Sequence, residues 1–180
     1  MNIENGHALL ALARATLARE LSVPHAPCVN TDSLNTPGAC HVTLKQRQAL
    51  RGSAGSLRAE RPLIEDLKAN SLVAAFHDPR FKPLTAHELD TLRIEVAVLV
   101  SIEPVRFDDE QHARAQMRAG IDGIVFEYGF HHSFVLPDVW QKFAHSTDVL
   151  IHLKRRAGLP PDFWNAQVKL TRYQVFKWSE

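Results

Sequence analysis

The sequence predicts an α+β fold: a mainly antiparallel sheet flanked by helices. Three observations carry this prediction. Segments of two-residue hydrophobic period and segments of helical period follow one another in mixed order. Short turns join neighbouring strands, as in β-hairpins, where a parallel sheet would need crossover helices. The chain of 180 residues is 45% hydrophobic and 23% charged, which suffices for a hydrophobic core without metals or disulfides.

The first half of the chain reads as helix, loop, hairpin and helix. Apolar residues at helical spacing predict a helix over 9–17, and the Pro- and Asn-rich segment 22–38 predicts a long loop that we expect to be partly mobile. Alternating residues predict strands over 39–45 and 50–57, and a helix should run from Pro62 to about residue 77. Two glycines inside the second strand indicate a bulge or a close approach of another segment.

The second half alternates strands and helices. Thr85 and Glu88 have the spacing of a capping box for a short helix. Alternation predicts a strand over 93–101, closed by Glu103-Pro104. The remaining predicted elements are a helix over 108–119, a turn over 120–123, a hairpin over 124–128 and 132–136, a helix over 138–156, a helical turn over 160–164 and a strand over 168–178.

Composition excludes several classes of partner. Twenty-one Lys and Arg balance 20 Asp and Glu, so we expect no nucleic-acid binding. No run approaches the ~20 apolar residues of a membrane span. The first apolar stretch is interrupted by Arg14 and Arg19, unlike a secretion signal, so we expect a cytoplasmic protein with no membrane association. In that compartment Cys28 and Cys40 are expected to be free thiols.

The chain has 10 histidines, an excess that raises the question of a metal or a proton switch. They show no ligand spacing: no HExxH motif occurs, and no cysteine lies at a suitable distance. His145 and His152 share a face of the predicted helix, but no third ligand accompanies them. We therefore predict no metal and no cofactor. The basic run 154–156 complements a helix C-terminus.

Six stretches, taken together, resemble the signatures of the AMMECR domain family, whose prokaryotic members are called AmmeMemoRadiSam system protein A. The stretches are LRGSAG at 50–55, AAFHDPRF at 74–81, LRIEV at 92–96, GIDG at 120–123, FVLP at 134–137 and AGLP at 157–160. The resemblance covers residues 7–178 in the expected order. It implies one domain of two unequal lobes with a cleft. It also implies Memo-like, dioxygenase-related and radical SAM proteins as partners, while the biochemical activity of the family is unsettled.

The sequence departs from the family signature at Ser53, where a cysteine is usual, and Arg155 lies near another position where cysteine is common. A catalytic thiolate is therefore not available at Ser53. The oligomeric state does not follow from the sequence.

The signature segments supply the candidate site residues. The backbone N–H groups of a glycine-exposed strand, with an arginine and two hydroxyls, suit an anionic group. The other interpretation is a bulged strand whose glycines allow close packing. The candidate ligand-binding residues are Arg51, Gly52, Ser53, Gly55, Ser56, Asp78 and Arg80.

Catalysis is the competing interpretation of the same residues. One catalytic hypothesis makes Ser53 a nucleophile that acts with His77 and Asp78. A nucleophile elbow has a glycine two residues before the serine, and this chain has Arg51 at that position. Glu95, a single charge in an apolar strand, needs a partner or a cleft, and Arg51 or Arg80 is the expected partner. The functions left open are binding of a small anionic or peptide-like ligand, hydrolytic or acid–base chemistry with His77 or Glu95 as base, and an interaction scaffold.

Overall fold

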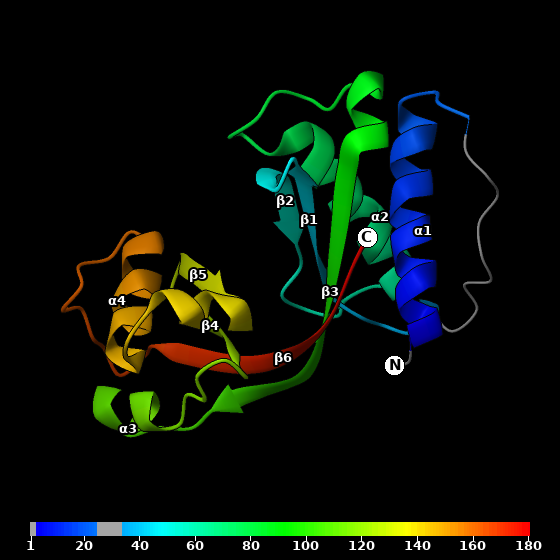
Figure 1. The fold of residues 1–180 in the computed structure, drawn as a ribbon. Helices are drawn as coiled ribbons and strands as arrows, with labels where there is room; N and C mark the ends of the chain where they lie inside the picture. Colours follow the sequence, from blue (N-terminus) through cyan, green and yellow to red (C-terminus); the bar gives the residue numbers. More distant parts are fainter. Residues whose placement is uncertain (1–2, 25–33) are drawn as a thin grey trace. The chain divides into compact units, whose positions relative to one another are not determined.

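The computed structural model describes residues 3–24 and 34–180. It contains a six-stranded sheet in the order β2-β1-β3-β6-β4-β5 with helices around it, so the predicted α+β class is confirmed (Figure 1). The chain divides into two compact units, of which the second is Val100–Val175 and the first holds the described residues before it together with Phe176–Glu180. Cys28 and most of the predicted loop 22–38 lie outside the described residues.

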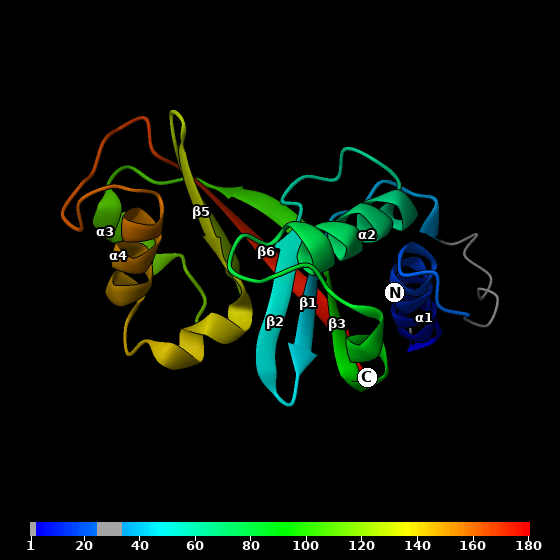
Figure 2. The ribbon, with the colours of Figure 1, turned by 90° about the horizontal axis from the view of Figure 1, so that it is seen from above.

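The first unit packs helices against β1, β2 and the start of β3. Its buried leucines and valines from α1, α2, β1 and β3 form one apolar core, and Figure 2 shows α2 lying across β1 and β2. The elements of this unit are α1 (Ile3–Glu20), β1 (Cys40–Gln46), β2 (Ala49–Gly55), α2 (Leu63–Leu72), the π-helix η2 (Val73–His77), the 3₁₀-helix η3 (Ala86–Thr91) and the first part of β3 (Leu92–Val105).

The second unit has its own core around the β4–β5 hairpin, with α4 packed on it. β4 pairs antiparallel with β5 on one side and with β6 on the other. Its elements are α3 (Glu110–Ala115), β4 (Gly123–Tyr128), β5 (His131–Val135), the 3₁₀-helix η4 (Pro137–Lys142), α4 (Ser146–Arg156) and most of β6 (Lys169–Ser179).

Four sequence predictions of element bounds were wrong. The expected helix over 138–156 is two helices, because the Asp148 carboxylate accepts a hydrogen bond from the His145 backbone N–H (3.1 Å) and starts α4 anew. The helix expected over 108–119 is only α3, which begins after Asp109, whose side chain caps it. β3 continues past Ser101, where the backbone takes a positive φ of 50°, to Val105. Residues 160–164 form turns without a helix.

Candidate functional site

The LRGSAG segment forms β2, and its glycines serve packing. Along the β1–β2 ladder, Leu44 faces Gly52 and Lys45 faces Leu50, so Arg51 is the extra residue of the expected bulge. A Cβ added to Gly52 would lie 2.0 Å from the carbonyl oxygen of Ala74 in η2. The backbones of β2 and η2 therefore meet at Gly52, at a distance that excludes any side chain.

Asp78 follows η2 directly and joins it to β2. Its carboxylate accepts hydrogen bonds from the Ser53 backbone N–H (2.9 Å) and from the Arg80 backbone N–H (3.1 Å). The Arg80 guanidinium donates to both carboxylate oxygens, at 2.9 and 2.6 Å, and to the Ser53 hydroxyl at 2.7 Å. The Asp78 side chain is 3% exposed, and these donors, Arg80 first, hold its pKa well below the ordinary value.

Arg51 makes a second arginine–carboxylate pair nearby. It donates through Nε and Nη2 to Glu88 (2.7 and 3.1 Å), and these bonds outweigh burial and lower the pKa of Glu88 to about 2. Glu88 also accepts from Thr85 in the predicted capping box, which is present at the start of η3. Both guanidiniums lie near the Phe81 ring, whose centroid is 6.0 Å from Arg51 Cζ and 5.5 Å from Arg80 Cζ.

These residues together are the two-arginine surface: Arg51, Ser53, Asp78, Arg80, Phe81 and Glu88. The two cations differ in accessibility. Arg51 is 14% exposed, and its Nη1 is buried without a hydrogen-bond partner among the described residues. Arg80 is 53% exposed, yet three of its contacts fix its orientation. Arg80 is therefore the cation that can meet an anion from solvent.

Glu95 does not belong to this surface, and its predicted partner was wrong. It pairs with Lys45 of β1 (2.6 Å) and Lys177 of β6 (3.1 Å) rather than with Arg51 or Arg80. Burial disfavours its charge, but the hydrogen bonds from the two lysines outweigh this and lower its pKa. A carboxylate with a lowered pKa is a weak general base at neutral pH.

The residues proposed for nucleophilic catalysis are not assembled. Ser53 accepts a hydrogen bond from Arg80, and its backbone N–H donates to Asp78. His77 ends η2 as an exposed residue, and within residues 3–24 and 34–180 no hydrogen bond joins its ring to Ser53. Activation of a serine hydroxyl needs a base within hydrogen-bond reach, which this arrangement does not provide.

Ser56 and Gly55 lie apart from the two-arginine surface, at the other end of β2. Ser56 donates to the buried Asp66 of α2 (2.6 Å), which also accepts from Arg61 (2.8 Å), Asn70 (2.9 Å) and the Cys40 N–H (2.9 Å). Burial, together with the Asp66 charge, raises the pKa of the Cys40 thiol. The Asp66–Asn70 pair was missed in the sequence, although its i, i+4 spacing beside an apolar helical stripe was a usable signal.

Other predicted features can also be placed. The described residues hold no group of three His, Cys, Asp or Glu side chains positioned for a metal ion. His145 precedes α4, so it does not share a helix face with His152 as expected. Lys154, in the basic run, is buried and pairs with Glu110 (3.0 Å). Among the described helices, none combines the length and apolarity required to cross a bilayer.

A family model, curated proteins and a solved structure are all similar to this chain over most of its length. The model of the AMMECR1 family matches residues 10–178. Protein MJ0810 of Methanocaldococcus jannaschii is 32% identical, covering 97% of this chain and 90% of that protein. A protein of Sulfolobus acidocaldarius is 31% identical, covering all of this chain and 83% of the relative. The crystal structure of the uncharacterized protein PH0010 from Pyrococcus horikoshii superposes with a TM-score of 0.89 at 27% identity, covering 100% of this chain and 93% of that one.

The fold and the match over nearly the whole chain define an AMMECR-type α+β domain, and the chain belongs to the AMMECR1 family. The biochemical function of this family is unknown.

Proposed function

We propose that the protein is a binding component that recognises an anionic group, on a small molecule or a peptide segment, at the two-arginine surface. One observation carries the proposal: the half-exposed Arg80 guanidinium is held by Asp78 and Ser53, so that its outward face is fixed before a ligand arrives. Asp78 and Ser53 take the Nε and Nη2 hydrogens of Arg80, so the two N–H groups of Nη1 are left to donate to a carboxylate or phosphate oxygen.

Preorganisation is the physical reason why Arg80 suits this role. A free arginine side chain loses up to ~2 kcal/mol of conformational entropy when it is ordered. Here folding already orders it, through the buried Asp78 behind it and the Phe81 ring beside it. An incoming anion therefore avoids much of this ordering cost.

The proposal favours binding over catalysis. Glu95 is paired with two lysines, and its lowered pKa makes it a weak proton acceptor. The Ser53 hydroxyl accepts a hydrogen bond from Arg80, which cannot take a proton. The Asp78 carboxylate has a lowered pKa, which makes it a weak base, and it bonds to the Ser53 backbone N–H rather than to the hydroxyl. Neither Glu95 nor Ser53 is therefore equipped for hydrolytic chemistry, whereas the Ser53 hydroxyl helps to orient Arg80 for an anion.

We further propose that the protein is an accessory component of an AmmeMemoRadiSam-type system, beside Memo-like and radical SAM proteins. Support for this part is the resemblance of the signature segments to the prokaryotic members of that system. In such a system the anionic group would belong to a shared substrate or to a partner's peptide segment.

Calorimetric titration tests the binding proposal. The wild-type protein and its variants are titrated with inorganic phosphate, nucleotides, small carboxylates and short acidic peptides. We expect Arg80→Gln to weaken any bound anion at least about tenfold, the equivalent of 1.4 kcal/mol. Arg80→Lys keeps the charge but loses the guanidinium that Asp78 and Ser53 hold in place, so its affinity should fall in between.

Arg93→Gln is the matched control, because Arg93 is an exposed arginine of β3 in the same unit. It should change the affinity less than about twofold, the effect expected of an exposed charge that solvent and salt screen. Equal affinities in the wild type, Arg80→Gln and Arg80→Lys would place the anion elsewhere and overturn the proposal.

A further inference from the structure

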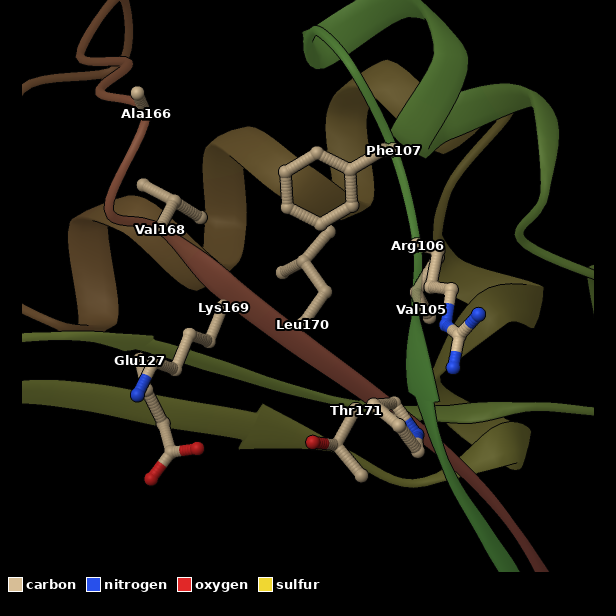
Figure 3. Close-up of a pocket in the computed structure, with 10 residues that line it drawn as sticks. Val105, Arg106, Phe107, Glu127, Ala166, Val168, Lys169, Leu170 and Thr171 are labelled. Carbon is tan, nitrogen blue, oxygen red and sulfur yellow. The ribbon is translucent and has the colours of Figure 1, made fainter.

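A groove in the second unit has the build of a small-molecule site and is separate from the two-arginine surface. It lies between the end of β3 and the start of β6, with a volume of about 370 Å³. Figure 3 shows Phe107, Val168 and Leu170 converging between these two segments. Volumes of this order are typical of pockets that take small ligands.

The floor of the groove is apolar and held in place. Val168 and Leu170 are 4% and 2% exposed and belong to the core of the second unit. Phe107 packs against the Trp164 ring at a centroid distance of 5.5 Å, which fixes the aromatic wall. Because Val168 and Leu170 expose little surface themselves, a hydrocarbon or aromatic body would release water mainly from the half-buried Phe107 ring above them.

Charged residues stand at two places around the floor. In Figure 3 Lys169 and Glu127 lie together on one side, where they are also cross-strand partners in the β4–β6 ladder. Arg106 stands on the opposite side, next to Val105. A lysine and a glutamate side by side largely offset each other, so Arg106 leaves the rim with a net positive charge.

We propose that this groove binds a small ligand with an apolar body and one carboxylate, its body on Phe107, Val168 and Leu170 and its carboxylate directed to Arg106. The exposed Arg106 is anchored at its backbone, since its carbonyl oxygen accepts a hydrogen bond from Gln116 (2.5 Å). The site does not rest on the function proposed for the two-arginine surface.

The test uses 3-phenylpropionate as probe and 3-phenylpropanol as its neutral counterpart. Tryptophan fluorescence, to which Trp164 beside the Phe107 wall contributes, reports binding, and nuclear magnetic resonance shifts of the groove residues locate it. In the wild type we expect the carboxylate to bind at least about fivefold more tightly than the alcohol, a modest ratio suited to an exposed ion pair.

Two variants and a control decide the outcome. Arg106→Gln should lower the affinity for 3-phenylpropionate to that for 3-phenylpropanol, and it should leave the affinity for 3-phenylpropanol unchanged. Ala166→Phe fills the groove from an exposed lining position and should abolish the binding of both probes. The control is Arg155→Gln, because Arg155 is exposed at the end of α4 and outside the groove. This variant should bind each probe as the wild type does.

The proposal is overturned if the carboxylate and the alcohol bind equally in the wild type, or if neither shifts the resonances of the groove residues. It is equally overturned if Ala166→Phe, folded by circular dichroism, binds both as the wild type does. Because Arg80→Gln leaves this groove intact, failure here and failure at the two-arginine surface are distinguishable.

Discussion

Replacing Asp78 by asparagine tests how η2 and β2 are joined. In the folded protein this carboxylate faces four donors and no acceptor, namely the Ser53 N–H and three N–H groups of Arg80. An amide in its place turns an NH₂ group toward two of these donors, whichever way it is oriented. The variant therefore loses the ion pair and leaves buried donors unpaired.

The loss can be estimated from the contacts. An unsatisfied buried N–H costs about 1–3 kcal/mol. The Arg80 pair adds only about 1 kcal/mol, because that guanidinium is half exposed and can turn to water. We expect Asp78→Asn to lower the free energy of unfolding by about 2–4 kcal/mol at neutral pH.

The pH dependence has a definite sign. The pKa of Asp78 is lower in the folded chain than in the unfolded one, so its stabilisation is complete above the unfolded value of about 4. It is lost as the pH falls through the lower folded pKa. The gap in unfolding free energy between the wild type and Asp78→Asn should therefore narrow below about pH 4.

Urea unfolding followed by circular dichroism, from neutral pH down to about pH 2.5, measures this gap. Asp162→Asn is the control, since Asp162 is exposed in the turn after α4, and it should change stability by less than about 0.5 kcal/mol. A gap below about 0.5 kcal/mol at neutral pH, or one that stays constant into acid, would refute the reasoning.

Three further predictions concern packing. Gly52→Ala should lower the free energy of unfolding in urea by about 3 kcal/mol, because the new Cβ clashes with the Ala74 carbonyl oxygen. Gly55→Ala should lower it less, because the nearest atom that its Cβ meets belongs to the His41 ring, and equal losses would contradict this. Lys154→Ala should cost about 3–5 kcal/mol, because it removes a buried side chain that pairs with Glu110 and lies over the Trp164 ring. Glu110→Gln should also destabilise, because it leaves the buried Lys154 ammonium without its carboxylate, and an unchanged urea midpoint for either variant would contradict this. Iodoacetamide should alkylate Cys40 more than about tenfold faster in urea than in the folded protein, as peptide mass spectrometry can show; equal rates would mean that the thiol is accessible.

Hydrophobic periodicity predicted most strands and helices, because burial on one face is a local property of the sequence. It failed where one polar side chain decides the outcome, as at Asp148, whose carboxylate starts α4 inside an apparently continuous helical pattern. The bulge beside Gly52 was predictable, because glycine inside a strand needs a reason in packing. The backbone partner of Gly52, the Ala74 carbonyl, was not predictable, because it comes from another element.

The site illustrates the same limit. Resemblance pointed to Arg51, Ser53, Asp78 and Arg80, and the structure brings these residues together. The expected partner of Glu95 was wrong because strand order cannot be read from chain order. β3 lies between β1 and β6, so the neighbours of Glu95 come from those two strands.

The π-helix η2 makes chain length, as well as residue type, a requirement of this region. Each turn of a π-helix closes its hydrogen bond one residue later than an α-helical turn. Deleting one residue from Val73–His77 would let an ordinary α-helical turn form, closed by one residue fewer, while the flanking turns keep their orientation. The deletion would remove the spacing that sets the Ala74 carbonyl against Gly52 and the Asp78 carboxylate against the Ser53 N–H, so a single-codon deletion could separate the folding of α2 from the assembly of the surface.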